Sequence, residues 1–142
     1  MYFNKHIILF LFLLALLTSN YNWAQTPPKL TAIGAQIYCP LSEIPIVTHF
    51  NIENPDDVEI KAVYIQISTG YVRGEDLLNL SVTHPNITAQ PFNNLEGKLE
   101  LRWTGAGNAV ISELISAVKN VVFRSSSNTP SASISRGCPT KP

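Results

Sequence analysis

A run of short alternating patterns between residues 54 and 123 sets the strongest constraint on how this 142-residue chain can fold. Its clearest member is Lys98–Trp103 (KLELRW), in which three apolar residues alternate with three charged ones. Such alternation predicts a strand with one buried and one solvated face. Further strands are expected at residues 30–38, 44–52, 60–67, 77–82, 86–89 and 121–123, separated by turn-forming glycine, proline, asparagine and aspartate.

One helical period interrupts this series of strands. Apolar residues recur at helical spacing between residues 110 and 118, and Asn108 is a candidate N-cap. Many short strands with a single short helix favour a mainly β fold, an immunoglobulin-like β-sandwich, over a barrel or an α/β fold.

The first 24 residues predict a secretory signal peptide. Lys5 and His6 precede the apolar stretch Ile7–Leu17, and Ala24 offers a small residue for cleavage. The stretch is shorter than the roughly 20 residues that a membrane-spanning helix needs. We therefore expect a secreted or cell-surface protein with no transmembrane segment after cleavage.

Cleavage would leave 118 residues, which is the size of one domain. We expect a linker over residues 25–30, a sandwich module over residues 31–124, and a serine-rich disordered or truncated tail over residues 125–142. Loss of Lys5 leaves nine basic residues against ten acidic ones. Because the basic residues are scattered, a nucleic-acid partner is not expected.

The order of the motifs also resembles a known family. NPDD, GYVRGEDLLNL, GKLELRW and ISELISAVKNVVF, followed by a serine–asparagine–proline turn, resemble the cadherin-like, chondroitin-sulfate-proteoglycan-type repeats of large secreted bacterial surface proteins. Residues 30–57 resemble the first module of proteins exported by the type IX secretion system. The resemblance implies a cadherin-like sandwich that spaces or supports an adhesive domain.

The tail departs from this family pattern. In the family, the residues after the serine-rich turn form a last strand, whereas residues 131–142 offer only Ile134 as a large apolar side chain. We therefore expect a sandwich that lacks its last strand, as in a truncated or frame-shifted product that forms the N-terminal fragment of a larger exported protein. An ordered and paired tail would contradict this expectation.

Acidic residues at two turns are candidate calcium ligands. Glu53, Asp56 and Asp57, joined by Glu75 and Asp76, offer the oxygen ligands that calcium prefers, and the resemblance to cadherin-like repeats implies such a use. The alternative is that these acids are simply solvated, because no EF-hand spacing is present. No other cofactor is expected.

Two cysteines, Cys39 and Cys138, are candidates for a disulfide in an export compartment. Both lie beside prolines in irregular sequence, and two cysteines alone do not fix their separation, so two unpaired thiols remain the alternative.

The function expected from these patterns is that of a non-enzymatic adhesion or structural module. No nucleophile motif such as Gly-x-Ser-x-Gly is present in the sequence. Expected partners are other extracellular protein domains or surface glycans. The alternative is a stand-alone carbohydrate- or calcium-binding module, in which Tyr71, at a corner between glycines, is the best surface aromatic, whereas Trp103 fills the core.

Overall fold

The computed structural model describes residues 26–34, 38–54, 56 and 59–128. These ranges contain β1 (Lys29–Ile33), β2 (Ile44–Pro45), β3 (His49–Glu53), β4 (Ala62–Gln66), β5 (Asp76–Leu80), β6 (Ile87–Ala89), β7 (Lys98–Trp103), α2 (Ile111–Lys119) and β8 (Val121–Ser125). The predicted signal peptide at residues 1–24 lies outside the described residues. So do residues 129–142, where the closing strand was expected to be missing.

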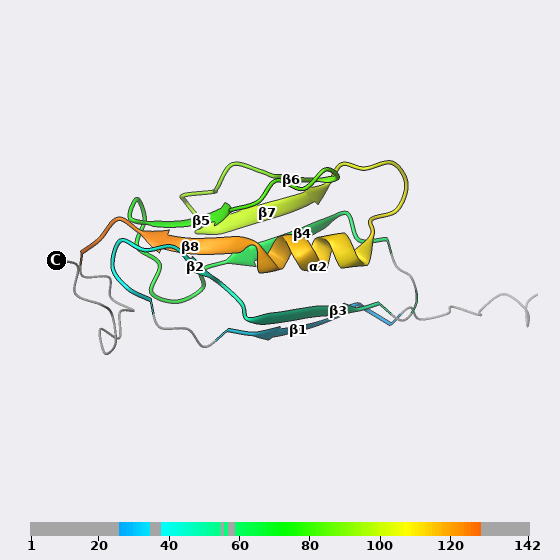
Figure 1. The fold of residues 1–142 in the computed structure, drawn as a ribbon, viewed down its shortest axis with the longest axis horizontal. Coiled ribbons are helices and arrows are strands. Elements are labelled where there is room, and N and C mark those ends of the chain that lie inside the picture. Colours follow the sequence, from blue (N-terminus) through cyan, green and yellow to red (C-terminus); the bar gives the residue numbers. More distant parts are fainter. Residues whose placement is uncertain (1–25, 35–37, 55, 57–58, 129–142) are drawn as a thin grey trace, which may run out of the picture.

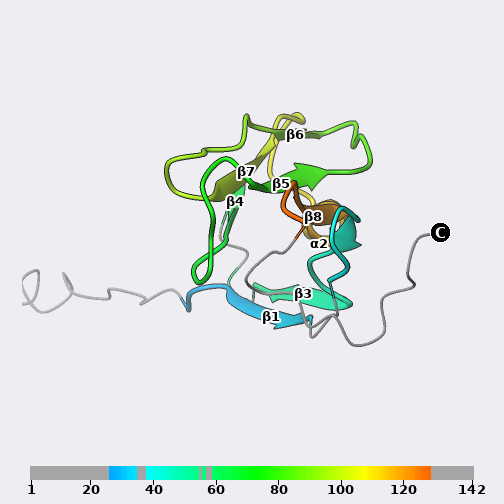
Figure 2. The same cartoon turned by 90° about the vertical axis from the view of Figure 1, so that its left-hand side faces the viewer.

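The strands form three small antiparallel sheets. β7 lies between β4 and β6, β8 lies between β2 and β5, and β1 pairs with β3. Figure 1 shows the β1–β3 pair beneath the other two sheets, and the quarter turn of Figure 2 shows it set apart from β4 and β7. The prediction of a mainly β, sandwich-like fold with one short helix is confirmed.

The core forms where the apolar face of β7 meets the helix and β3. Leu101 is 0% exposed and lies opposite Val63 in the β4–β7 ladder. From the helix, Leu114 and Val118 point into the same cluster, which Phe50 of β3 completes. Because α2 contacts β3, β6 and β7, it closes one flank of the sandwich.

The N-cap of the helix lies two residues later than the sequence suggested, and the helix itself begins one residue later. The prediction that Asn108 caps it is wrong, because the N-cap is Val110, which has an extended backbone and makes no side-chain capping bond. Gly107 has a φ of 72°, so the chain is still turning at that point. Glu113 in the first turn and Lys119 in the last turn both interact favourably with the helix dipole.

The stretch 44–52, predicted as one strand, forms two strands in different sheets. The N–H of Ile46 donates to the Val121 carbonyl at 3.1 Å, whereas the N–H of Thr48 donates to the Ile33 carbonyl at 2.7 Å. The chain therefore crosses between sheets within two residues. The alternation of burial breaks at this crossing, where Ile46 and Val47 are both half-buried and Thr48 and His49 are both exposed.

Two strands also extend beyond the expected limits of the sandwich module. β1 begins at Lys29, inside the predicted linker, and ends at Ile33, earlier than expected. β8 continues to Ser125, the first residue of the predicted tail. Strand pairing with β3 and β5 explains both extensions.

The packing predicts a large cost for shortening Leu101. Leu101→Ala should lower the free energy of unfolding by about 2–5 kcal/mol, because it removes a fully buried side chain at the centre of the core. Leu95→Ala is the matched control. Leu95 is 72% exposed, so its truncation should change stability by less than about 0.5 kcal/mol in urea denaturation. Equal effects of the two variants would contradict the described core.

Candidate functional site

Two of the acids predicted as calcium ligands, Glu53 and Asp56, have separate partners. Glu53 forms an exposed ion pair with Lys29, 3.7 Å between Oε2 and Nζ, and the Asp56 carboxylate accepts the backbone N–H of Thr26. Asp57 lies outside the described residues. Glu75 is exposed beside Asp76 at the start of β5. Within the described ranges, no three acidic, histidine or cysteine side chains gather where they could hold a metal ion.

Asp76 has a structural role that explains its burial. It is 6% exposed, and its Oδ2 accepts the N–H of Val72 at 2.8 Å. Its own N–H donates to the Val72 carbonyl at 3.1 Å. The two bonds close the corner that leads from Tyr71 into β5, so this carboxylate is engaged by the fold.

Tyr71, the aromatic residue expected at the surface, has contacts within the fold. The residue is half-buried, its ring packs against Gly97, and its hydroxyl donates to the Asn94 carbonyl at 2.8 Å. An edge-on contact with Phe92, 6.2 Å between ring centroids, fixes the other side of the ring. Tyr71 therefore supports the turn before β7, and its use as a sugar-binding aromatic stays a prediction.

Two other aromatic residues border a hollow of about 360 Å³ at one end of the β4–β7 ladder. Tyr64 is 60% exposed, and Trp103 is half-buried with its Nε1–H donating to the Gly107 carbonyl at 3.2 Å. Lys98 lies over the Tyr64 ring, 5.8 Å from its centroid. A hydrogen bond from Lys98 to Glu96, together with the charge of that carboxylate, raises the pKa of the Lys98 ammonium. One face of Tyr64 is thus occupied by a charged lysine.

Cys39 lies next to the residue that anchors the end of β8. It is bonded in a disulfide, but Cys138 lies outside the described residues, so the pairing of these two cysteines stays a prediction. The neighbouring Tyr38 is buried, and its hydroxyl accepts the N–H of Ser125 at 2.8 Å. This contact holds the segment around Cys39 against the last described strand.

The outer edge of β4 presents backbone groups without partners. In the β4–β7 ladder, Val63 lies opposite Leu101 and Ile65 opposite Leu99. The bonds from Trp103 to Lys61 and from Ile67 to Gly97 show that odd-numbered residues of β4 bond to β7. Since antiparallel ladders alternate, the even-numbered residues point their N–H and C=O groups away from β7: Ala62, Tyr64 and Gln66. Among the described residues, nothing hydrogen-bonds to these three N–H groups.

Two hollows without charged side chains follow one another along this edge. The first, about 300 Å³, is lined by Ala62, Val63 and Tyr64 together with residues of β1 and β3, including Leu30 and Ile52. The second, about 420 Å³, is lined by residues 65–67 together with Tyr38, Ile46 and apolar residues of the β2–β8–β5 sheet, including Ile44, Leu78 and Phe123. We call the outer edge of β4 and these two hollows the β4 edge site.

Sequence reasoning did not find the β4 edge site. The strand predicted at residues 60–67 contains β4, in which Val63 is buried while Tyr64 and Gln66 are exposed. Alternation says nothing, however, about whether a strand lies at the centre or the edge of a sheet. Only the order of the strands reveals that β4 is an edge strand.

Comparison with known proteins adds no family to this description. No family model, no curated protein and no solved structure matches the chain. In the described part of the chain, the single helix α2 is too short to cross a membrane.

Neighbouring acids at the start of β5 allow a direct test of their roles. Asp76→Ala should lower the free energy of unfolding by about 1–3 kcal/mol, because it leaves the Val72 N–H without its acceptor. Glu75→Ala, at the exposed neighbour, should change it by less than about 0.5 kcal/mol. Both effects should be the same with calcium and with chelator in urea denaturation. A calcium-dependent loss in both variants would instead favour the predicted ligand role.

Proposed function

We propose that this chain is a non-enzymatic secreted or cell-surface module, a cadherin-like sandwich that works by contact with other extracellular proteins. The observation that supports it is the β4 edge site, where unpaired backbone groups border uncharged apolar hollows. An exposed strand edge is a template for pairing with another polypeptide. Apolar surface beside it adds the burial that stabilises protein contacts.

Two polar side chains considered above as ligand-binding groups, those of Asp76 and Tyr71, favour the same proposal because both make hydrogen bonds within the fold. The bonds of the Asp76 carboxylate and the Tyr71 hydroxyl hold turns in place. Export, suggested by residues 1–24, would place such a module where extracellular partners are available.

Carbohydrate binding is the second candidate function. Its support is the hollow between Tyr64 and Trp103, where Arg102 and Lys61 add hydrogen-bond donors beside aromatic rings. Lys98 already covers one face of Tyr64, which leaves less aromatic surface for a sugar ring to stack on.

Adhesion of the labelled chain to the outer surface of the producing cells separates the two candidates. We expect binding to be lost when the cells are first treated with a protease and to persist after treatment with glycosidases. The reason is that an edge strand pairs with polypeptide and not with sugar. The opposite pattern, together with specific binding on a glycan array, would replace the proposed function by carbohydrate binding.

A further inference from the structure

We propose that the β4 edge site binds an extended segment of a second, different polypeptide, which adds to β4 as a strand and presents alternating uncharged apolar side chains to the two hollows. This inference rests on the proposed function and specifies its partner. It has three supports, which are the unpaired backbone groups, the spacing of the hollows and the distribution of charge.

The backbone defines the conformation of the partner. The outward N–H and C=O groups of Ala62, Tyr64 and Gln66 repeat at every second residue, as in a strand edge ready to form another ladder. A helix or a sugar cannot match this repeat, because neither offers alternating backbone donors and acceptors at the spacing of a strand. The partner segment must therefore be extended.

The hollows define its side chains. One lies beside residues 62–64 of β4, and the other lies beside Ile65 and Gln66 of β4 and the following Ile67. Successive side chains of a strand point to opposite faces, so every second side chain of an added strand would enter the hollows and the others would lie beside Tyr64. Side chains of valine, isoleucine or leucine suit hollows lined by Leu30, Ile52 and Phe123.

Charged residues on and beside the strands near the two hollows pair with one another and do not favour a charged inner face of the partner. Lys29 pairs with Glu53, Lys61 pairs with Glu59, and Lys98 pairs with Glu96. No charged side chain lines either hollow. A charged residue of the partner would therefore be buried without a counter-ion, which is strongly unfavourable. An uncharged apolar segment is complementary to this neutral surface.

Two other occupants fit less well. A second copy that paired through its own β4 would leave the hollows empty, because its Val63 and Ile65 already face its own interior. The remainder of this chain starts near the second hollow, because β8 ends beside Tyr38 and Tyr38 lines that hollow, but it lacks the alternating apolar side chains that two hollows need. Residues 129–142 also contain a single large apolar residue, Ile134.

The test uses the full-length gene product and a blocked peptide, acetyl-Lys-Thr-Val-Thr-Ile-Thr-Val-Lys-amide. At a peptide concentration about ten times its dissociation constant, amide hydrogen exchange at Ala62, Tyr64 and Gln66 should slow about tenfold, because bound peptide protects these groups. Exchange at Val63 and Ile65, which already bond to β7, should stay unchanged. A scrambled peptide with its three apolar residues adjacent should bind at least about tenfold more weakly.

A matched pair of variants tests the backbone contact. Tyr64→Pro removes the central outward N–H and should weaken peptide binding at least about tenfold, since proline is tolerated at a strand edge but cannot donate there. Tyr64→Thr keeps the N–H and should bind within about threefold of the unchanged chain. Should Tyr64→Pro disturb the circular dichroism spectrum, N-methylation of alternate peptide nitrogens tests the same bonds and should weaken binding to the same degree.

Four results would overturn the inference. One is equal binding of the ordered and scrambled peptides. Another is peptide binding that stays unchanged both in a folded Tyr64→Pro variant and after N-methylation of the peptide. A third is concentration-dependent protection of the three amides without peptide, which would assign the edge to a second copy. The fourth is protection of the three amides without peptide that disappears when residues 129–142 are deleted. That result would assign the edge to the chain's own tail.

The adhesion experiment distinguishes failure of the inference from failure of the proposed function. Protease-sensitive adhesion that persists in Tyr64→Pro would preserve the proposed function and exclude the β4 edge site as its contact. Adhesion that depends on glycans alone would contradict the proposed function, whatever the peptide does.

Discussion

The single register in which β4 pairs with β7 is the constraint on which both the core and the β4 edge site depend. With Val63 opposite Leu101, the apolar side chains of both strands face inward. The same register sends the backbone groups of Tyr64 outward to the free edge. Because side chains alternate with a period of two, a slip of one residue would expose the apolar face and reverse which N–H groups are free.

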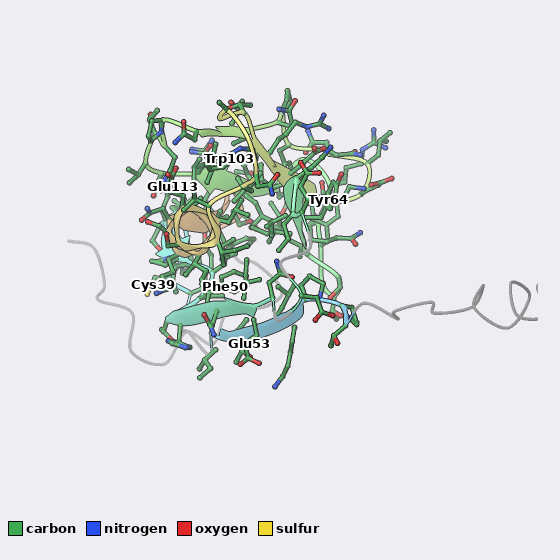
Figure 3. All side chains as sticks on the ribbon, turned by 90° about the vertical axis from the view of Figure 1, so that its right-hand side faces the viewer. Cys39, Phe50, Glu53, Tyr64, Trp103 and Glu113 are labelled. Carbon is green, nitrogen blue, oxygen red and sulfur yellow. The ribbon has the colours of Figure 1, made fainter. Side chains whose placement is uncertain are left out.

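The two flanks of the sandwich differ in how they are closed. On one flank, α2 packs Leu114 and Val118 against β3 and β7 and covers the interior. On the other flank lies β4, and Figure 3 shows Tyr64 on the side opposite the helix residue Glu113. Here the interior borders two hollows. A helix satisfies its own backbone, whereas a strand edge needs a neighbour, so the flank at β4 is open to a partner in a way that the flank at α2 is not.

Much of the fold was predictable because local alternation and burial agree. The limits of β7 match those expected, and the helix differs by one residue at each end. The division of residues 44–52 between two sheets was not predictable, because Ile46 and Thr48 are bonded to strands distant in the sequence. The alternation of apolar and polar residues predicts which side chains are buried, but the choice of pairing strand depends on tertiary contacts.

The candidate sites were harder to predict for the same reason. Asp76 bonds to Val72, four residues earlier, and such a local bond could have been suspected from its place after a glycine corner. Tyr71 packs on Gly97, far away in the sequence, and no local pattern reports that contact. The most direct test of the account is amide hydrogen exchange along β4 in the free chain. The account predicts fast exchange at Ala62, Tyr64 and Gln66 and slow exchange at Val63 and Ile65, whereas uniform protection along β4 would contradict an open edge.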